Sequence, residues 1–136
     1  MMHPTYFETH FAVADPSVEW PAEFAIITAY APTGKKWTDE QNAAADERLE
    51  KQLRHHGGLI RRITGYSPET GHAEPGWAVE LKWQNACDLG SEYLQDAIYF
   101  VSGDDLSVSF CDSRRELVRV GTFRDRLTSS IMRSPK

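Results

Sequence analysis

The order of the apolar segments is the feature of this chain that most constrains its fold. Two segments have the 3.6-residue period of an amphipathic helix, residues 38–56 and 85–97. Four have the length and apolar character of strands: residues 24–30, 59–66, 77–83 and 97–101. They alternate as β-α-β-β-α-β, which is the order of the ferredoxin-like motif. The sequence therefore predicts an α+β, ferredoxin-like two-layer sandwich, with another sheet covered by helices on one face as the alternative.

The first helix carries the clearest local signals. Thr38 and Gln41 fit a capping box, in which two side chains satisfy free backbone N–H groups at the start of the helix. Asn42 lies on a face that is otherwise apolar, together with Leu49 and Leu53. An inward-facing amide needs hydrogen-bond partners. Asn42 is therefore expected either to hold a neighbouring loop or to contact a ligand.

Other segments extend this core at both ends. Asn85 is expected to cap the second helix, where Gly90 lowers helix stability unless it allows close packing on the sheet. The last residues, 124–132, are expected to form a short helix. Three further segments have strand character: residues 5–13, 106–110 and 117–123. Residues 106–110 are expected to form a C-terminal β-hairpin extension with the predicted strand at 97–101.

No repeat, low-complexity tract or linker divides the 136 residues, so we expect one domain, 1–136. Its core spans residues 24–111, preceded by an arm, 1–23, and followed by a basic extension, 112–136. From residue 113 onward there are seven Lys or Arg and two acidic residues, whereas the whole chain has a formal net charge of −5. The overall charge argues against a nucleic-acid binder. The basic extension is either a solvated segment or a patch for an acidic partner.

Cysteine content and hydropathy bound the other possibilities. Cys87 and Cys111 are too few for a disulfide scaffold and lack CxxC spacing, so we expect reduced thiols and neither a metal nor a cofactor. Residues 1–13 contain Glu8 and two histidines and do not resemble a signal peptide. No apolar run approaches the length of a membrane span. We therefore expect a cytoplasmic protein without a membrane partner.

The predicted topology brings distant polar segments together. The loop after Tyr30, the helix start with Asn42, the loop with His72 and the junction at Gln95 all meet at one end of a ferredoxin-like sheet. Cys87 is expected at the opposite end. This convergence predicts a ligand pocket lined by Tyr30, Lys35, Asn42, His72, Glu74 and Gln95.

Two short motifs in these loops carry chemistry. His72 and Glu74 form an H-x-E pair and are weak candidates for acid–base catalysis, with a structural or merely exposed role as the alternative. Zinc deaminases also need a P-C-x-x-C segment, which this chain lacks. Gly34, Lys35 and Lys36 precede a helix N-terminus, where backbone N–H groups favour anions, but they do not form the Walker pattern. A solvated basic loop is the alternative.

The chain also resembles a known family. The resemblance is to a bacterial family named domain of unknown function 3293, and its motifs span residues 6–111. They are Phe24-Ala-Ile-Ile-Thr-Ala-Tyr-Ala-Pro-Thr-Gly34, Gln41-Asn42, Gly65, Pro68, His72-Ala-Glu74, Leu89-Gly90 and Gln95-Asp-Ala-Ile98. The family usually has Asn where this chain has Ala31, and often a second Asn where it has Ala45-Asp46. The resemblance implies no established activity.

Two hypotheses of function follow from these observations. In the first, the pocket recognises a small polar or anionic molecule, such as a nucleotide-like one, with chemistry by His72 or Glu74 as a possible addition. In the second, the protein is an interaction or regulatory module that acts through a sheet edge or the basic C-terminal segment. Under the second hypothesis, the loop residues only stabilise the fold.

Overall fold

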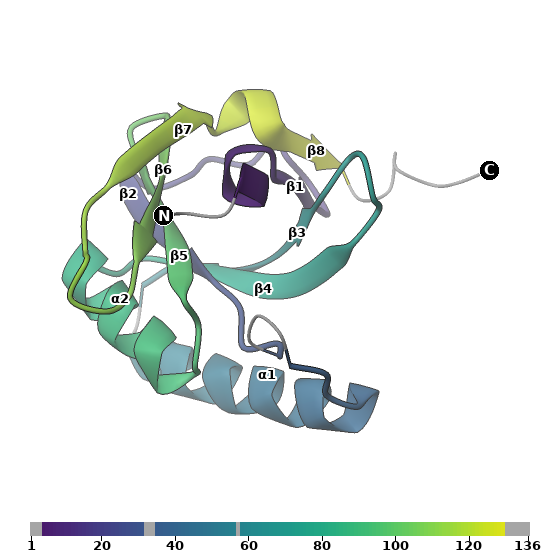
Figure 1. Ribbon diagram of the computed structural model, residues 1–136. Coiled ribbons are helices and arrows are strands. Elements are labelled where there is room, and N and C mark those ends of the chain that lie inside the picture. The colour runs from purple at the N-terminus through teal and green to yellow at the C-terminus, as the bar shows by residue number, and fades with distance from the viewer. Residues whose placement is uncertain (1–3, 32–34, 57, 130–136) are drawn as a thin grey trace.

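One sheet of eight strands dominates the computed structural model, which describes residues 4–31, 35–56 and 58–129 (Figure 1). The sheet curls into a half-barrel, and the helices α1 (Asp39–Arg54) and α2 (Trp83–Glu92) lie on its convex side. Two short 3-10 helices are present, η1 (Pro4–Phe7) and η2 (Arg124–Arg126). The strands are β1 (His10–Val13), β2 (Glu23–Ile27), β3 (Ile60–Tyr66), β4 (Ala73–Val79), β5 (Ala97–Ser102), β6 (Asp105–Phe110), β7 (Val118–Thr122) and β8 (Leu127–Ser129).

The strand order across the sheet is β7-β6-β5-β2-β4-β3-β1-β8. Neighbouring strands are antiparallel except β1 and β8, which pair in parallel. The two edge strands, β7 and β8, follow each other in the chain and are joined through η2. Because the sheet curls, this short connection spans the gap between its edges, as the run of β7, η2 and β8 across the top of Figure 1 shows.

The predicted ferredoxin-like two-layer sandwich with a C-terminal β-hairpin extension is wrong. The element order β-α-β-β-α-β occurs within residues 23–102, but β1 and β8 lengthen the sheet beyond β3, and β6 and β7 lengthen it beyond β5. The lengthened sheet curls until its second face encloses a core of its own. A two-layer sandwich has a single core, whereas the described residues form two.

Alternation along β2 shows how one strand serves both cores. Ala25 and Ile27 face the helices and belong to the convex core, with Leu49 of α1. Phe24 and Ile26 face the other way, into the concave core, whose further members are Phe11, Val13, Ile63, Ala78, Val101, Leu106 and Phe123. The strongly apolar character of residues 24–27 is therefore explained by burial on both faces.

Several predicted element boundaries need correction. The strand predicted at 77–83 is β4, which begins at Ala73 and ends at Val79. The helix α2 then begins at Trp83 with Lys82 as its N-cap, and Asn85 lies inside its first turn instead of capping it. Trp83 continues the apolar alternation, but its indole N–H donates to Ser109 Oγ and its ring packs on the convex core.

The two ends of the chain also differ from prediction. The strand expected at 5–13 is replaced by η1 followed by the shorter β1. The helix expected at 124–132 is replaced by η2 and β8, and residues 130–132 lie outside the described part. Arg126 accounts for the extended path of this segment. Its guanidinium donates to the carbonyl of Thr9, just before β1, and to that of Val120 in β7, and so holds the segment against both strands.

Two local predictions are confirmed. The Thr38 hydroxyl accepts from the Gln41 N–H at 3.1 Å, and the Gln41 side chain accepts from the Thr38 N–H at 2.8 Å, so the capping box is complete. Gly90 allows close packing, since a Cβ there would lie 2.7 Å from Cys111 Sγ and 2.8 Å from Ile98 Cγ2.

Candidate functional site

A cleft of about 940 Å³ opens at one end of the half-barrel, where β2 and β3 end and β4 and β5 begin. We call it the mouth cleft. Its inner part is lined by side chains of the concave face, and its outer part by loop residues. All six residues predicted to bind a ligand line it: Tyr30, Lys35, Asn42, His72, Glu74 and Gln95.

The loop after β2 is fixed by two amide side chains from the helices. Asn42, in the first turn of α1, accepts a hydrogen bond from the Ala31 N–H at 2.9 Å. Gln95, just after α2, donates to the Tyr30 carbonyl at 2.9 Å and to the Tyr93 carbonyl at 3.1 Å. The inward-facing amide that the sequence predicted thus holds a loop. Asn42 Nδ2 and Gln95 Oε1 are the atoms left over for a bound molecule.

A helix C-cap of the Schellman type delivers Gln95 to this position. The N–H of Gln95 donates to the Gly90 carbonyl at 2.8 Å, and the N–H of Leu94 to the Ser91 carbonyl at 3.0 Å. Leu94 occupies the left-handed position of the motif, with φ 63°, where glycine is usual. Its side chain is 59% exposed, so packing does not explain a leucine there.

His72 and Glu74 face each other at the opposite wall. His72 ends the turn between β3 and β4, which is closed by a hydrogen bond from the Ser67 N–H to the His72 carbonyl at 2.9 Å. Glu74 lies on β4 and points to the same side, with 3.2 Å between His72 Nε2 and Glu74 Oε2. The His72 side chain is 73% exposed and that of Glu74 35% exposed. The pair can accept or donate a proton at the cleft surface, with the carboxylate orienting the ring.

Lys35 and Lys36 supply positive charge at the rim. Both side chains are exposed, and within the described residues neither makes a hydrogen bond or ion pair. Gly34, the first residue of the predicted anion-binding motif, lies outside that part of the chain. The first turn of α1 is capped by Thr38 and contains the acidic residues Asp39 and Glu40, so the lysines, not the helix N-terminus, are the features that favour an anion.

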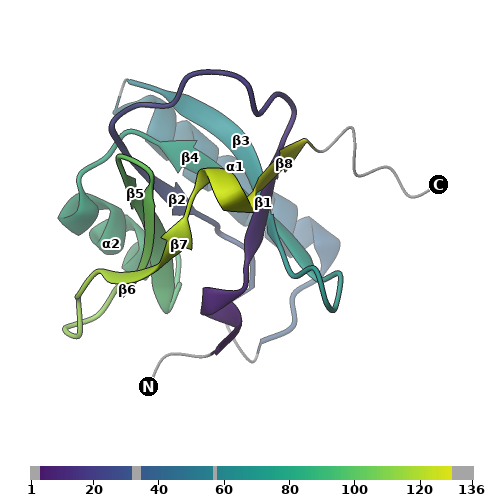
Figure 2. The same cartoon turned by 90° about the horizontal axis from the view of Figure 1, so that it is seen from above.

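The sequence did not predict the part of the cleft that the arm contributes. η1 lies within the curl of the sheet in Figure 1 and at the start of β1 in Figure 2, and Tyr6 and Thr9 line the cleft. The Tyr99 hydroxyl donates to the Tyr6 carbonyl at 3.0 Å, and burial raises the pKa of Tyr99 above its usual range. Alternation along β5 buries Ile98 and Phe100 in the convex core and places Tyr99 on the concave face. In the predicted two-layer sandwich that face would be exposed to solvent, so the sequence did not indicate Tyr99 as a residue of the cleft.

The cysteines do not take part in the mouth cleft. Cys87 Sγ lies 3.6 Å from both Ser109 Oγ and the Phe110 carbonyl, and both thiols are buried and reduced, as the sequence indicated. A hydrogen bond from Cys111 lowers the pKa of Cys87, and the same neighbour together with burial raises the pKa of Cys111. Neither thiol is exposed to a molecule in the cleft.

Asp46 has a structural role on the convex side. Its carboxylate accepts from both terminal nitrogens of Arg62, at 2.8 and 2.9 Å, and from the Trp77 indole N–H at 3.1 Å. The Arg62 guanidinium also stacks 4.3 Å from the centre of the Trp77 ring. The cluster joins α1 to β3 and β4 beside the mouth cleft.

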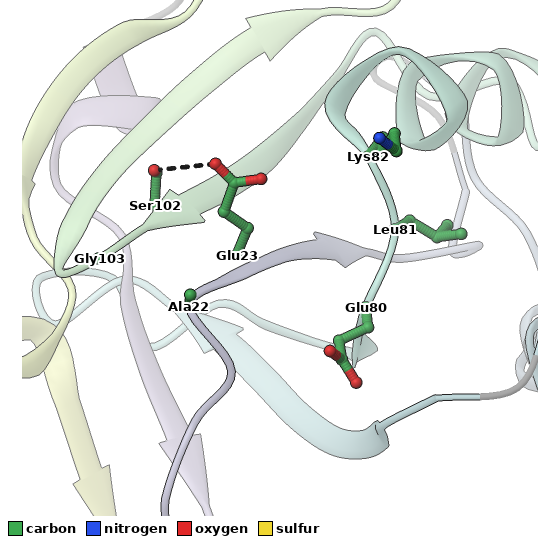
Figure 3. Close-up of a pocket in the computed structure, with 7 residues that line it drawn as sticks. All are labelled: Ala22, Glu23, Glu80, Leu81, Lys82, Ser102 and Gly103. Atoms are coloured by element: carbon green, nitrogen blue, oxygen red, sulfur yellow. Dashed lines mark hydrogen bonds between the residues drawn. The ribbon is translucent and has the colours of Figure 1, made fainter.

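A shallow hollow of about 470 Å³ lies at the other end of the sheet, where β2 begins and β4 ends. Figure 3 shows Ser102 donating to Glu23, at 3.2 Å, while Glu80 turns away from Glu23. Glu80 accepts from the Leu59 N–H at 2.9 Å, so both carboxylates already have partners. The hollow therefore offers less to a ligand than the mouth cleft does.

Within residues 112–129, the arginines of the C-terminal segment have partners within the chain. Four of them pair with aspartates: Arg114 with Asp112, Arg115 with Asp88, Arg119 with Asp105 and Arg124 with Asp104. Their charges are largely neutralised locally, which weakens the case for a basic patch over residues 112–129. An interaction role for this segment stays a prediction.

Residues 4–31, 35–56 and 58–129 contain neither a cluster of metal-ligating side chains nor a helix that could cross a membrane. Within them no three His, Cys, Asp or Glu side chains gather closely enough to hold a metal ion. His55 and His56 follow α1 at the end remote from its capped first turn, and neither lines the cleft. Neither of the two described α-helices is long and apolar enough to span a bilayer.

Together, fold and site define a strand-rich half-barrel with helices on its convex side and a polar cleft at one mouth. The chain belongs to the family described as protein of unknown function (DUF3293), whose model matches residues 27–98, more than half of the 136 residues. This confirms the resemblance seen in the sequence. The matched segment contains all six residues predicted for the pocket. No curated protein and no solved structure gives a significant match.

Proposed function

We propose that the protein binds a small polar or anionic molecule, up to the size of a nucleotide, in the mouth cleft. One observation carries the proposal: four segments far apart in the chain place Tyr30, Asn42, His72 and Gln95 around one cleft of ligand size. Two unpaired lysines at the rim add an attraction for anions. The paired arginines of the C-terminal segment give the interaction-module alternative less support.

The residues around the cleft divide into supporting and contacting groups. Asn42 and Gln95 each use one side-chain atom to hydrogen-bond the Tyr30–Ala31 backbone, and so fix the loop that forms one wall of the cleft. The side chains of His72 and Lys35 are exposed and make no hydrogen bond that joins two strands or helices. They are the side chains expected to contact the bound molecule, and His72 with Glu74 is the pair positioned for any proton transfer to it.

A thermal-shift screen of the purified protein against phosphate, nucleotides, other metabolites and metal salts tests the proposal. A ligand present at 100 times its Kd stabilises the folded protein by about 2.7 kcal/mol. Unfolding entropy scales as about 2.1 cal/mol/K per residue, so for a chain of this length the shift in Tm is roughly 9 °C.

Two charge-reversal variants localise the response. Lys35→Glu should abolish the shift produced by an anionic ligand. Lys82→Glu should leave it unchanged, because Lys82 is also exposed but lines the hollow at the opposite end. Equal losses in both variants, or no shift with any compound, would contradict the proposal.

A further inference from the structure

The inner part of the mouth cleft differs in character from its rim. Along β2 and β3, side chains two residues apart share a face, so Thr28 follows Ile26 and Gly65 follows Ile63 on the concave side. All four line the cleft, together with the ring of Tyr99 from β5. The inner part of the cleft, which we call the chamber, is therefore bounded by aliphatic and aromatic groups behind a polar and charged opening, although Ile26 is only 7% and Ile63 only 1% exposed.

Gly65 leaves part of the chamber floor without a side chain. It pairs with Phe11 of β1 on one side and with Glu74 of β4 on the other, and glycine weakens a strand at such a position. A Cβ at Gly65 would lie 3.4 Å from Thr9 Cγ2 and 3.6 Å from Phe11 Cε1, which are ordinary contact distances. Packing therefore does not require glycine here. The neighbouring Gly76 is different, since its Cβ would lie 2.6 Å from the Ile27 carbonyl oxygen.

Polar atoms inside the chamber are already engaged. The Thr28 hydroxyl donates to the Pro75 carbonyl at 2.9 Å and accepts from the Tyr30 N–H at 3.2 Å. The Thr9 hydroxyl donates to the Thr5 carbonyl at 3.0 Å, and Tyr99 donates to Tyr6. What the walls offer to a ligand is carbon surface and ring faces, not free donors and acceptors.

We infer that the chamber holds a flat aromatic ring, and that the ligand of the mouth cleft is an aryl anion whose charged group lies at the rim beside Lys35. The inference rests on the proposed function and names its ligand class. Aromatic rings bind to such walls by stacking and apolar contact. A nucleobase would bury several edge donors and acceptors without partners, which disfavours it against a ring with an apolar edge.

A calorimetric comparison of simple probes tests the inference. We expect phenyl phosphate to bind at least tenfold more tightly than inorganic phosphate, and ribose 5-phosphate to gain no such factor. Benzoate, compared with acetate, shows whether a carboxylate serves as well as a phosphate. A phenyl phosphate affinity no greater than that of inorganic phosphate or ribose 5-phosphate would overturn the inference and leave the proposed function standing.

The variant Gly65→Ala places one methyl group on the chamber floor. It should remove most of the gain from the phenyl ring and leave inorganic phosphate binding within a factor of two. An unchanged ratio of phenyl phosphate to phosphate affinity would contradict the inference. Should the variant fail to fold, methyl NMR of the unsubstituted protein decides: phenyl phosphate, but not phosphate, should shift the Ile26 and Ile63 δ-methyl signals, and absence of that shift refutes the chamber.

Failure of the proposed function looks different. None of the probes would then bind, and Lys35→Glu would behave like the unsubstituted protein in every titration. That result would remove both the site and its ligand class.

Discussion

His72→Ala separates a residue that serves a ligand from one that holds the fold. The His72 side chain is 73% exposed and makes one contact with a partly exposed carboxylate, Glu74, at 3.2 Å. Exposed pairs of this kind contribute about 0–1 kcal/mol. Leu49, fully buried in the convex core, is the matched core control, and Leu49→Ala should cost about 2–5 kcal/mol.

Unfolding entropies of about 2.1 cal/mol/K per residue convert these energies into melting temperatures. For this chain, Leu49→Ala should lower Tm by roughly 7–17 °C, and His72→Ala by less than about 4 °C. Calorimetry or circular dichroism of the two variants measures both shifts. If the Tm of His72→Ala falls as far as that of Leu49→Ala, the turn before β4 stabilises the fold. That result would contradict the ligand proposal and favour the interaction-module hypothesis.

Three further substitutions test the local structure by chemical denaturation. Leu94→Gly should stabilise the protein by about 0.5–1 kcal/mol, because a left-handed φ is unfavourable for leucine and its side chain packs little; a loss of stability would contradict the assigned C-cap. Gly90→Ala should destabilise by about 1–3 kcal/mol despite alanine's higher helix propensity, since its Cβ would overlap Cys111 Sγ, and a neutral effect would contradict the close approach. Tyr99→Phe should lower the unfolding free energy by about 1 kcal/mol at neutral pH, because the substitution removes the hydroxyl that donates to the Tyr6 carbonyl. Above a pH of about 10, Tyr99 deprotonates in the unfolded chain before it does so in the folded protein, where burial raises its pKa. The unfolding free energy of the wild type should therefore fall by up to about 1.4 kcal/mol per pH unit more than that of Tyr99→Phe. A stability difference between the two proteins that does not change with pH would contradict the raised pKa.

Short-range signals in the sequence predicted much of the convex half of the molecule. The capping box of Thr38 and Gln41 and the stripe of Leu49 and Leu53 depend on residues within a few turns of one helix, so the sequence pattern describes them completely. The close approach at Gly90 was also foreseeable, because an uncompensated glycine lowers helix stability.

The curl of the sheet could not be predicted in the same way. It depends on β1 pairing with β3 and β8, which are contacts between distant residues that local periodicity does not encode. The apolar run at residues 24–30 was the available signal, since a strand buried on both faces needs a second core. The meeting of Tyr30, Asn42, His72 and Gln95 was expected because it needs only the element order within residues 23–102, which the structure has.

The arm illustrates the same limit for the candidate site. Thr9 and Phe11 lie far from residues 63–65 and 99 in the sequence, and only the curled sheet places them around one chamber. Asn85 was misassigned as a cap for a different reason. The chain leaves β4 at Val79, earlier than the alternation of apolar residues suggests, so the N-cap of α2 is Lys82, three residues before Asn85.

Amide chemical shifts of the ¹⁵N-labelled protein test most directly whether the mouth cleft is the binding site. During titration with inorganic phosphate and then phenyl phosphate, we predict shifts concentrated at Tyr30, Lys35, His72 and Gln95, with the hollow around Ser102 unaffected. An acidic peptide should produce no saturable change. Saturable shifts along residues 114–126 with that peptide, and none around the cleft with the phosphates, would contradict the account.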